Sequence, residues 1–289
     1  MIESMLVFGL VNSAVLMLLA LGFSLTFGLS GVANFSHGGI YLFAGYLAYF
    51  LLKMGLPYFI AVVLTIFITA LLGAAIYKLI VIRVRGIVLN EVIATFAIGI
   101  CMLEFFRWLG FVTYEYSLPY IARGRFTIFE TTLDYQRSLI IVVALLLAVF
   151  LWFFTHRTKT GLALLGMAQD EYTALAVGID SDWAATYSFA IGGAFAAIAA
   201  VMILPLGIIN INIGYEVLLI ALAVTVLGGL ESTKGLILAC IILGYAQVIT
   251  STFFAPHWKE AVYLAAILIV LAVKPSGLLG KFKELEERV

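Results

Sequence analysis

Charge is the scarcest property of this 289-residue chain: 11% of its residues are Asp, Glu, Lys or Arg, and they sum to zero net charge. A soluble domain carries about a quarter charged residues. A nucleic-acid-binding surface needs an excess of Lys and Arg, which this chain lacks. With 64% hydrophobic residues and a mean hydropathy of +1.17, the composition predicts an all-α protein, a polytopic transmembrane helical bundle. We expect residues 1–289 to form a single transmembrane domain.

Catalytic and cofactor motifs are also scarce. Cys101 and Cys240, the two cysteines, both lie in apolar runs, so we expect buried small side chains and no disulfide framework or metal site. There is no Gly-x-x-x-x-Gly-Lys-Ser/Thr phosphate loop, so the chain is not expected to hydrolyse ATP. No Asp lies within a predicted span, which argues against an intramembrane enzyme. We expect no enzyme activity, cofactor or metal.

Long apolar runs, by contrast, fill the chain. One crossing of a bilayer takes about 20 apolar residues. The predicted segments are 5–28, 39–52, 57–82, 88–108, 138–156, 183–205, 214–230, 235–254 and 258–273. They predict eight or nine crossings, because 39–52 and 258–273 are short and 39–52 also fits a half-helix.

Two of these runs are interrupted. Residues 4–52 form a stretch of 49 residues without charge, and a polar patch at 28–39 with four glycines predicts a broken helix there. A second interruption, 205–214, begins at Pro205. Non-helical backbone at membrane depth survives only where protein or a water-filled cavity covers it, and such breaks form substrate sites in transporters. Paired breaks are also typical of an internally repeated transporter.

Polar residues at and near these breaks are the candidates for the pathway. We interpret His37 as a structural group of the break rather than a substrate contact. Glu91 either is solvated at the boundary of its span or faces the pathway. Glu104 and Arg107 are three apart and are expected to pair on one helix face. The candidates for the translocation pathway and broken helices are Asn34, Ser36, His37, Gly38, Gly39, Glu91, Thr95, Asn210, Asn212 and Glu216.

Two loops are long enough to bind partners. Loop 157–182 predicts a short helix near 167–177, with acidic residues in its first turns, Gly178 as its stop and Asp180, Ser181 or Asp182 as the cap of the next span. Such a helix either binds a partner whose movement it passes on to the two flanking spans, or lies on the membrane surface. Loop 109–137 is either a docking surface or a plain connection.

Positive charge predicts the orientation. With the N-terminus outside and the C-terminus cytoplasmic, ten Lys and Arg residues lie inside and six outside. Because cytoplasmic loops carry the excess of Lys and Arg, this orientation is favoured. The tail 274–289 is then cytoplasmic, loop 157–182 faces the cytoplasm and loop 109–137 faces outward.

Several stretches of the sequence together form a recognisable pattern. They are Asn34-Phe35-Ser36-His37-Gly38 with Gly45-Tyr46, Glu91–Gly99 followed by Glu104, Thr160-Gly161 leading to Gln169-Asp170 and Ala176–Ile179, Gly228–Leu230, and Lys274–Gly280. In this combination the whole chain resembles the permease subunits of branched-chain amino-acid ABC transporters. Two departures are Lys274, where the family usually has Arg, and the turn 229–235, which is less rich in glycine.

The resemblance implies a fold like that of a type II ABC importer. It implies ATP-driven import of branched-chain or hydrophobic amino acids across a bacterial-type inner membrane. The implied partners are a second permease subunit, homologous or identical, two cytoplasmic ATP-binding subunits, and a periplasmic or lipid-anchored substrate-binding protein. The residues implied to couple to the ATPase are Gly161, Gln169, Asp170, Glu171, Tyr172, Ala176 and Gly178.

Other functions remain open. Related permeases resemble this one but carry urea, short amides or aromatic acids, and a stand-alone facilitator channel has a similar composition. Charges that cluster near the ends of spans argue against an ion-coupled carrier.

Overall fold

The structure, a computed structural model, describes residues 2–111, 116–128, 131–230, 232–255 and 258–280. Helices make up most of it, and one β-hairpin joins two of them. The elements are α1 Ile2–Ser24, η1 Leu25–Leu29, α2 His37–Lys53, α3 Tyr58–Ile76, η2 Tyr77–Val81, α4 Ile82–Val84, α5 Val88–Trp108, β1 Arg125–Ile128, β2 Thr131–Asp134, α6 Tyr135–Arg157, α7 Lys159–Gln169, α8 Glu171–Ala176, α9 Ser181–Ile203, η3 Leu204–Leu206, α10 Asn212–Gly228, α11 Thr233–Phe253 and α12 Lys259–Val273.

Every apolar segment expected from the sequence is a helix, which confirms the all-α bundle. Within the described residues, six helical stretches are long and apolar enough to cross a membrane by themselves: 2–29, 58–84, 88–108, 135–157, 181–206 and 233–253. The other three segments correspond to α2, α10 and α12, which have 17, 17 and 15 residues. The expected eight or nine crossings are therefore six full-length spans and three shorter apolar helices.

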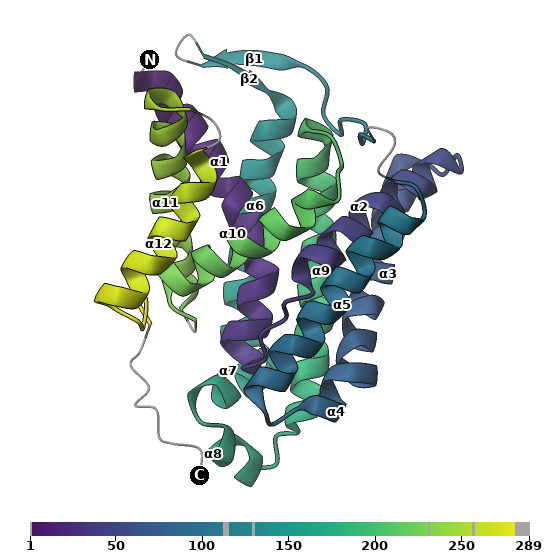
Figure 1. The fold of residues 1–289 in the computed structure, drawn as a ribbon, viewed down its shortest axis with the longest axis vertical. Helices are drawn as coiled ribbons and strands as arrows, with labels where there is room; N and C mark the ends of the chain where they lie inside the picture. The colour runs from purple at the N-terminus through teal and green to yellow at the C-terminus, as the bar shows by residue number, and fades with distance from the viewer. Residues whose placement is uncertain (1, 112–115, 129–130, 231, 256–257, 281–289) are drawn as a thin grey trace.

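Among the full-length spans, α1 and α9 lie at the centre of the bundle, and the shorter helices α2 and α10 are also largely buried (Figure 1). In α1 and α9, 67% and 61% of the most apolar window is buried, against 22–33% in the spans formed by α3, α5, α6 and α11. The outer helices expose large apolar side chains such as Phe67, Leu146 and Ile242. A hydrocarbon environment solvates such side chains, so the protein is a multi-pass membrane protein.

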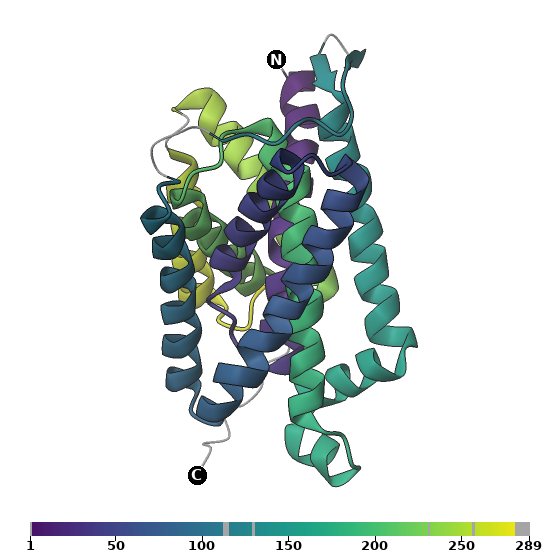
Figure 2. The ribbon, with the colours of Figure 1, turned by 90° about the vertical axis from the view of Figure 1, so that its right-hand side faces the viewer.

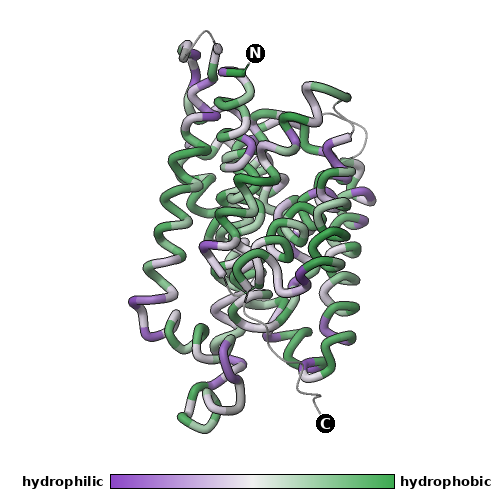
Figure 3. The backbone as a smooth tube through the Cα atoms, turned by 90° about the vertical axis from the view of Figure 1, so that its left-hand side faces the viewer, coloured by the Kyte–Doolittle hydropathy of each residue, from purple (hydrophilic) through white to green (hydrophobic). Residues whose placement is uncertain are grey.

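Polar structure gathers at the two ends of the bundle (Figures 2 and 3). At one end, the hairpin end, β1 pairs antiparallel with β2, with Arg125 opposite Asp134. At the other, the elbow end, α7 and α8 leave the bundle before the chain returns as α9. The hairpin within loop 109–137 is absent from the sequence analysis, because two four-residue strands leave little periodic signal.

Two sequence expectations are wrong. Cys101 is exposed on α5 rather than buried, whereas Cys240 is buried. The helix expected near 167–177 is two helices, because the backbone at Asp170 is extended, with φ −154° and ψ 106°. The amphipathic pattern of the sequence continues through Asp170, so it does not indicate that the helix is interrupted there.

Two of the distant sequence stretches meet in the fold. The amides of Leu278 and Leu279 donate to the carbonyls of Leu227 and Gly228, at 2.8 and 3.2 Å. Residues 274–280 therefore close over the turn between α10 and α11. Residues 281–289 of the predicted cytoplasmic tail lie outside the described residues.

Candidate functional site

The first helix break lies where the sequence predicts it, between η1 and α2. Its polar side chains turn inward: Asn34 and Ser36 are 1% and 0% exposed. The Oδ1 atom of Asn34 accepts hydrogen bonds from the amide of Ser36 at 3.2 Å and from its hydroxyl at 2.5 Å. The side chain of Asn34 thus substitutes for part of the missing helical hydrogen bonding, which backbone at membrane depth requires.

His37, the first residue of α2, fixes the break against α1. Its side chain is buried, and Nε2 lies 3.0 Å from the carbonyl oxygen of Leu19. The ring also packs edge-to-face against Phe23, with centroids 5.9 Å apart. These contacts are those of a group that holds two segments together.

The α5 helix covers the break from the other side. Thr95 is fully buried; its Oγ1 accepts from the amide of Phe35 at 3.2 Å and lies 3.1 Å from the carbonyl oxygen of Ala33. One turn further along α5, the backbone of Gly99 lies against Phe35 and Ser36. The break is therefore enclosed by protein between α1 and α5.

The two helix breaks meet at a pair of glycines. A Cβ built on Gly38 would lie 1.9 Å from the carbonyl oxygen of Gly214, so the start of α2 touches the start of α10 backbone to backbone. Gly39 packs in the same way against Gly99. The recess between α2, α5 and α10 holds about 10 Å³, the room of a single water, so it is closed to a substrate in this conformation.

The remaining pathway candidates divide into two groups. Glu91 is buried, 6% exposed, and its carboxylate accepts from the amide of Gly86 at 2.9 Å, so it is not a solvated boundary residue. By contrast Asn210, Asn212 and Glu216 are exposed around the start of α10. Asn210 accepts from the amide of Ile213 at 3.1 Å. The structure brings together the candidates of the first break and α5, and leaves these three on the surface.

Beside the second break, the loop that follows α5 makes a main-chain contact. The amide of Ile209 donates to the carbonyl of Tyr116 at 2.7 Å. The second break is thereby tied to loop 109–137 at the hairpin end. As expected, Glu104 and Arg107 pair on α5, with Oε2 and Nε 3.4 Å apart.

The elbow, defined here as α7 and α8 with the residues that join them to α6 and α9, is ordered by local caps. Thr158 begins α7 by accepting from the amide of Gly161 at 3.0 Å. Asp170 ends α7 and begins α8, accepting from the amide of Thr173 at 3.2 Å. Gly178 ends α8 with φ +86°, and Asp180 caps α9 by accepting from the amides of Asp182 and Trp183. The elbow is therefore a built connection.

The proposed coupling residues all lie on this elbow. Gly161 is buried in the first turn of α7, while Gln169, Asp170, Ala176 and Gly178 are exposed. Glu171 and Tyr172 begin α8, and their side chains lie outside the described part of the chain. The exposed members face away from the bundle at its elbow end.

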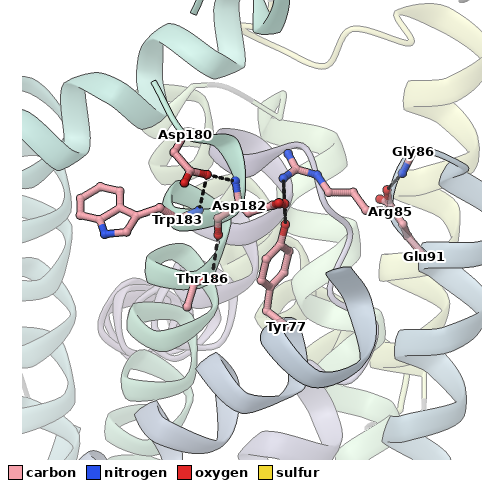
Figure 4. A network of polar contacts seen from close by, with 8 residues as sticks. All are labelled: Tyr77, Arg85, Gly86, Glu91, Asp180, Asp182, Trp183 and Thr186. Carbon is pink, nitrogen blue, oxygen red and sulfur yellow. Dashed lines mark hydrogen bonds and ion pairs between the residues drawn. The ribbon is translucent and has the colours of Figure 1, made fainter. Parts of the chain in front are cut away.

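One polar cluster escapes the sequence analysis (Figure 4). Nη1 of Arg85 donates to Oδ1 of Asp182 at 2.5 Å and to Oη of Tyr77 at 2.8 Å, and Tyr77 donates to the same Oδ1 at 2.8 Å. Arg85 follows α4, Asp182 lies in the first turn of α9, and Tyr77 opens the π-helical stretch η2. In the sequence, the pairing of Arg85 with Asp182 is indicated only by their opposite charges and by their positions at the ends of two spans on the same side of the membrane.

Within the described residues, nine apolar helices, a buried first break in contact with the start of α10, and an exposed helical elbow are the features of a polytopic transport permease. The family model described as "Branched-chain amino acid transport system / permease component" matches residues 5–271. This chain belongs to that family of branched-chain amino acid transport system permeases.

Two curated relatives cover nearly the whole chain. The high-affinity branched-chain amino acid transport system permease protein BraD of Pseudomonas aeruginosa is 30% identical, over 96% of this chain and 95% of its own length. Its counterpart LivH of Escherichia coli is 28% identical, over 91% of each chain.

A solved structure shares the fold. It is entitled "PsaBC from Streptococcus pneumoniae in complex with Fab", and the match covers 94% of this chain and 92% of that chain. The TM-score is 0.52 and the sequence identity is 18%, so the likeness is one of architecture.

Proposed function

We propose that this chain is the membrane-spanning permease subunit of an ATP-driven importer for branched-chain or other hydrophobic amino acids. The observation that carries the proposal is the family match over residues 5–271, which includes both helix breaks and the elbow. The names of BraD and LivH give the substrate class for those proteins. The chain has no phosphate loop, so a partner subunit hydrolyses the ATP.

The elbow is the proposed contact with that partner. Gln169, Asp170 and Ala176 are exposed there, and α8 leads into α9, a central helix of the bundle. A push on the elbow therefore reaches the core of the permease directly. We assign Gly161, Glu171, Tyr172 and Gly178 to the same coupling segment.

The pathway lies beside the first break. Asn34, Ser36, His37, Gly38 and Gly39 form it together with Glu91 and Thr95 of α5, and α10 with Asn210, Asn212 and Glu216 borders it. Substrate passes when α5 and α10 separate at the closed recess. Its apolar lining, which includes Phe35, Phe96 and Leu218, suits a hydrophobic side chain.

Other subunits complete the transporter. A second permease subunit, two cytoplasmic ATP-binding subunits and a periplasmic or lipid-anchored binding protein form the complex in the plasma (inner) membrane. The binding protein docks at the hairpin end, the N-terminus is outside and the C-terminus is cytoplasmic. The excess of Lys and Arg on the elbow side supports this orientation.

The test is affinity purification from native membranes, followed by reconstitution in liposomes of the chain with the proteins that co-purify. We expect an ATP-hydrolysing subunit at near-equal stoichiometry, and ATP-dependent uptake of leucine, isoleucine or valine. Triple replacement of Gln169, Asp170 and Glu171 by Ala should release the ATPase. Lys78→Ala, an exposed change outside the elbow, should retain it.

Three outcomes contradict the proposal. A chain that purifies alone and moves solute without ATP is a facilitator. ATP-driven uptake of urea, short amides or aromatic acids, with none of the branched-chain amino acids, overturns the substrate class. An ATPase retained by the triple variant overturns the placement of the coupling segment.

A further inference from the structure

The cluster of Tyr77, Arg85 and Asp182 joins the elbow end of α9 to the turn before α5. Asp182 lies two residues after the cap of α9, so it moves with the end of the elbow. Arg85 is 16% exposed and Asp182 49% exposed, so the ion pair is partly shielded from solvent. A shielded, charge-assisted hydrogen bond shared with a Tyr hydroxyl is stronger than an exposed ion pair.

Behind this cluster, α9 and α3 are packed as one body. A Cβ on Gly73 would lie 2.2 Å from the carbonyl oxygen of Phe189, and a Cβ on Gly193 would lie 2.6 Å from that of Thr69. Backbones this close cannot slide past each other without separating. A displacement of α9 therefore carries α3, and with it Tyr77.

On the α5 side of the cluster, the turn after Arg85 is hydrogen-bonded to α5. The amide of Gly86 donates to the carboxylate of Glu91 in the first turn of α5. One further turn along the helix, Thr95 is hydrogen-bonded to the first break. A continuous set of contacts thus runs from the elbow to the break: α9, Asp182, Arg85, Gly86, Glu91 and Thr95.

The two sides of α5 differ in the space they leave for movement. On the side of the break the recess holds about 10 Å³. On the opposite side, an apolar groove of about 600 Å³ lies between α5 and α3, and Phe43 of α2 also lines it. Apart from the cluster end, where the two helices are joined, α5 can tilt into this groove and away from the break.

We propose that the Arg85–Asp182 ion pair, held by Tyr77, transmits displacement of the elbow to α5, which tilts toward the groove and opens the closed recess. Arg85, Asp182 and Tyr77 are positioning residues in this proposal, since they act on the pathway through α5. The proposal rests on the function proposed above.

The first test measures substrate transported per ATP hydrolysed in the complete reconstituted transporter. Arg85→Gln and Asp182→Asn should each lower this ratio about tenfold while ATP hydrolysis stays near wild type, and the loss of a partly shielded pair should also lower the melting temperature slightly. The exchanged double variant, Arg85→Asp with Asp182→Arg, should recover a large part of the ratio. Tyr77→Phe, which keeps the ion pair, should cause a smaller loss.

The matched control is the ion pair within α5 itself. Glu104→Gln removes the charge from the exposed Glu104–Arg107 pair at the far end of the same helix. This variant should keep the wild-type ratio. If the Arg85–Asp182 pair only stabilised the fold, its removal would lower the melting temperature and leave the transport ratio unchanged.

A second measurement uses the exposed Cys101, which lines the groove on α5. With Cys240 replaced by Ser, a nitroxide on Cys101 should change its mobility when the ATPase is trapped with ATP and vanadate. Arg85→Gln should abolish that change, and this readout needs no transport by the variant.

An unchanged transport ratio in Arg85→Gln and Asp182→Asn, or a nitroxide response that persists in Arg85→Gln, overturns the link and leaves the importer intact. A wild-type complex that does not transport with ATP overturns the importer, and the link with it.

Discussion

At the scale of single residues, the contact between Gly38 and Gly214 leaves no room for a side chain. The two breaks meet there backbone to backbone, so any side chain at Gly38 must displace α10. Gly207 offers a comparison in the same region, because a Cβ at that position meets nothing within 4 Å. Replacement by Ala is therefore expected to affect the stability of the protein at Gly38 but not at Gly207.

We expect Gly38→Ala to destabilise the protein by about 1–3 kcal/mol, the usual cost of forcing an extra group into a packed interior. Gly207→Ala should change the stability by less than about 0.5 kcal/mol. Thermal scans in detergent, at one fixed scan rate, measure both as shifts of the melting temperature. Equal shifts for the two variants would contradict the close contact between the breaks.

At the scale of elements, the elbow depends on one residue that serves two helices. Asp170 follows the last residue of α7, and its carboxylate caps α8 through the amide and hydroxyl of Thr173. A helix of six residues has little stability of its own. The cap and the Gly178 turn therefore decide whether α8 keeps its shape.

Asp170→Ala removes the cap, which is worth about 1 kcal/mol. We expect amide hydrogen exchange across α8, at millisecond labelling times, to become about fivefold faster, the factor that corresponds to that energy. Exchange in α9 should be unchanged, because Asp180 caps it separately. Asp170→Asn retains an accepting oxygen and should exchange at nearly the wild-type rate; a wild-type rate in Asp170→Ala would exclude the capping role.

At the scale of the whole molecule, the hairpin and the elbow lie at opposite ends of the bundle (Figure 1). If the elbow end is assigned to one side of the membrane, the hairpin end therefore lies on the other side. The excess of Lys and Arg assigns the elbow end to the cytoplasm. Because Cys101 and Cys240 lie within apolar helices, a single cysteine introduced at either end of the bundle can report which side of the membrane that end faces.

Labelling of such reporters with an impermeant maleimide, in a Cys101→Ser background, checks the orientation. In right-side-out vesicles, Thr127→Cys on β1 should react at once. Gln169→Cys on α7 should react only after the membrane is permeabilised. Both positions are exposed, so access differs only by the side of the membrane. The reverse pattern would place the N-terminus inside.

The helices and their interruptions can be predicted from the amino-acid sequence. Hydropathy located all nine apolar helices, because the need to satisfy backbone groups within a bilayer turns an apolar run into a helix. Glycine and asparagine marked both breaks and Pro205 the second, while Gly178 marked the end of α8 and the residues 180–182 the start of α9. These features are local, so neighbouring residues are enough to specify them.

Which helix faces meet depends on the packing of the whole bundle. It placed Gly38 on Gly214, paired Arg85 with Asp182, buried Glu91 and exposed Cys101. In these spans apolar side chains cover faces that meet protein and faces that meet lipid, so periodicity does not separate the two. Small residues and close backbone contacts choose the packing instead, and partners about 100 residues apart, such as Arg85 and Asp182, are specified by the packed bundle and not by their own surroundings in the chain.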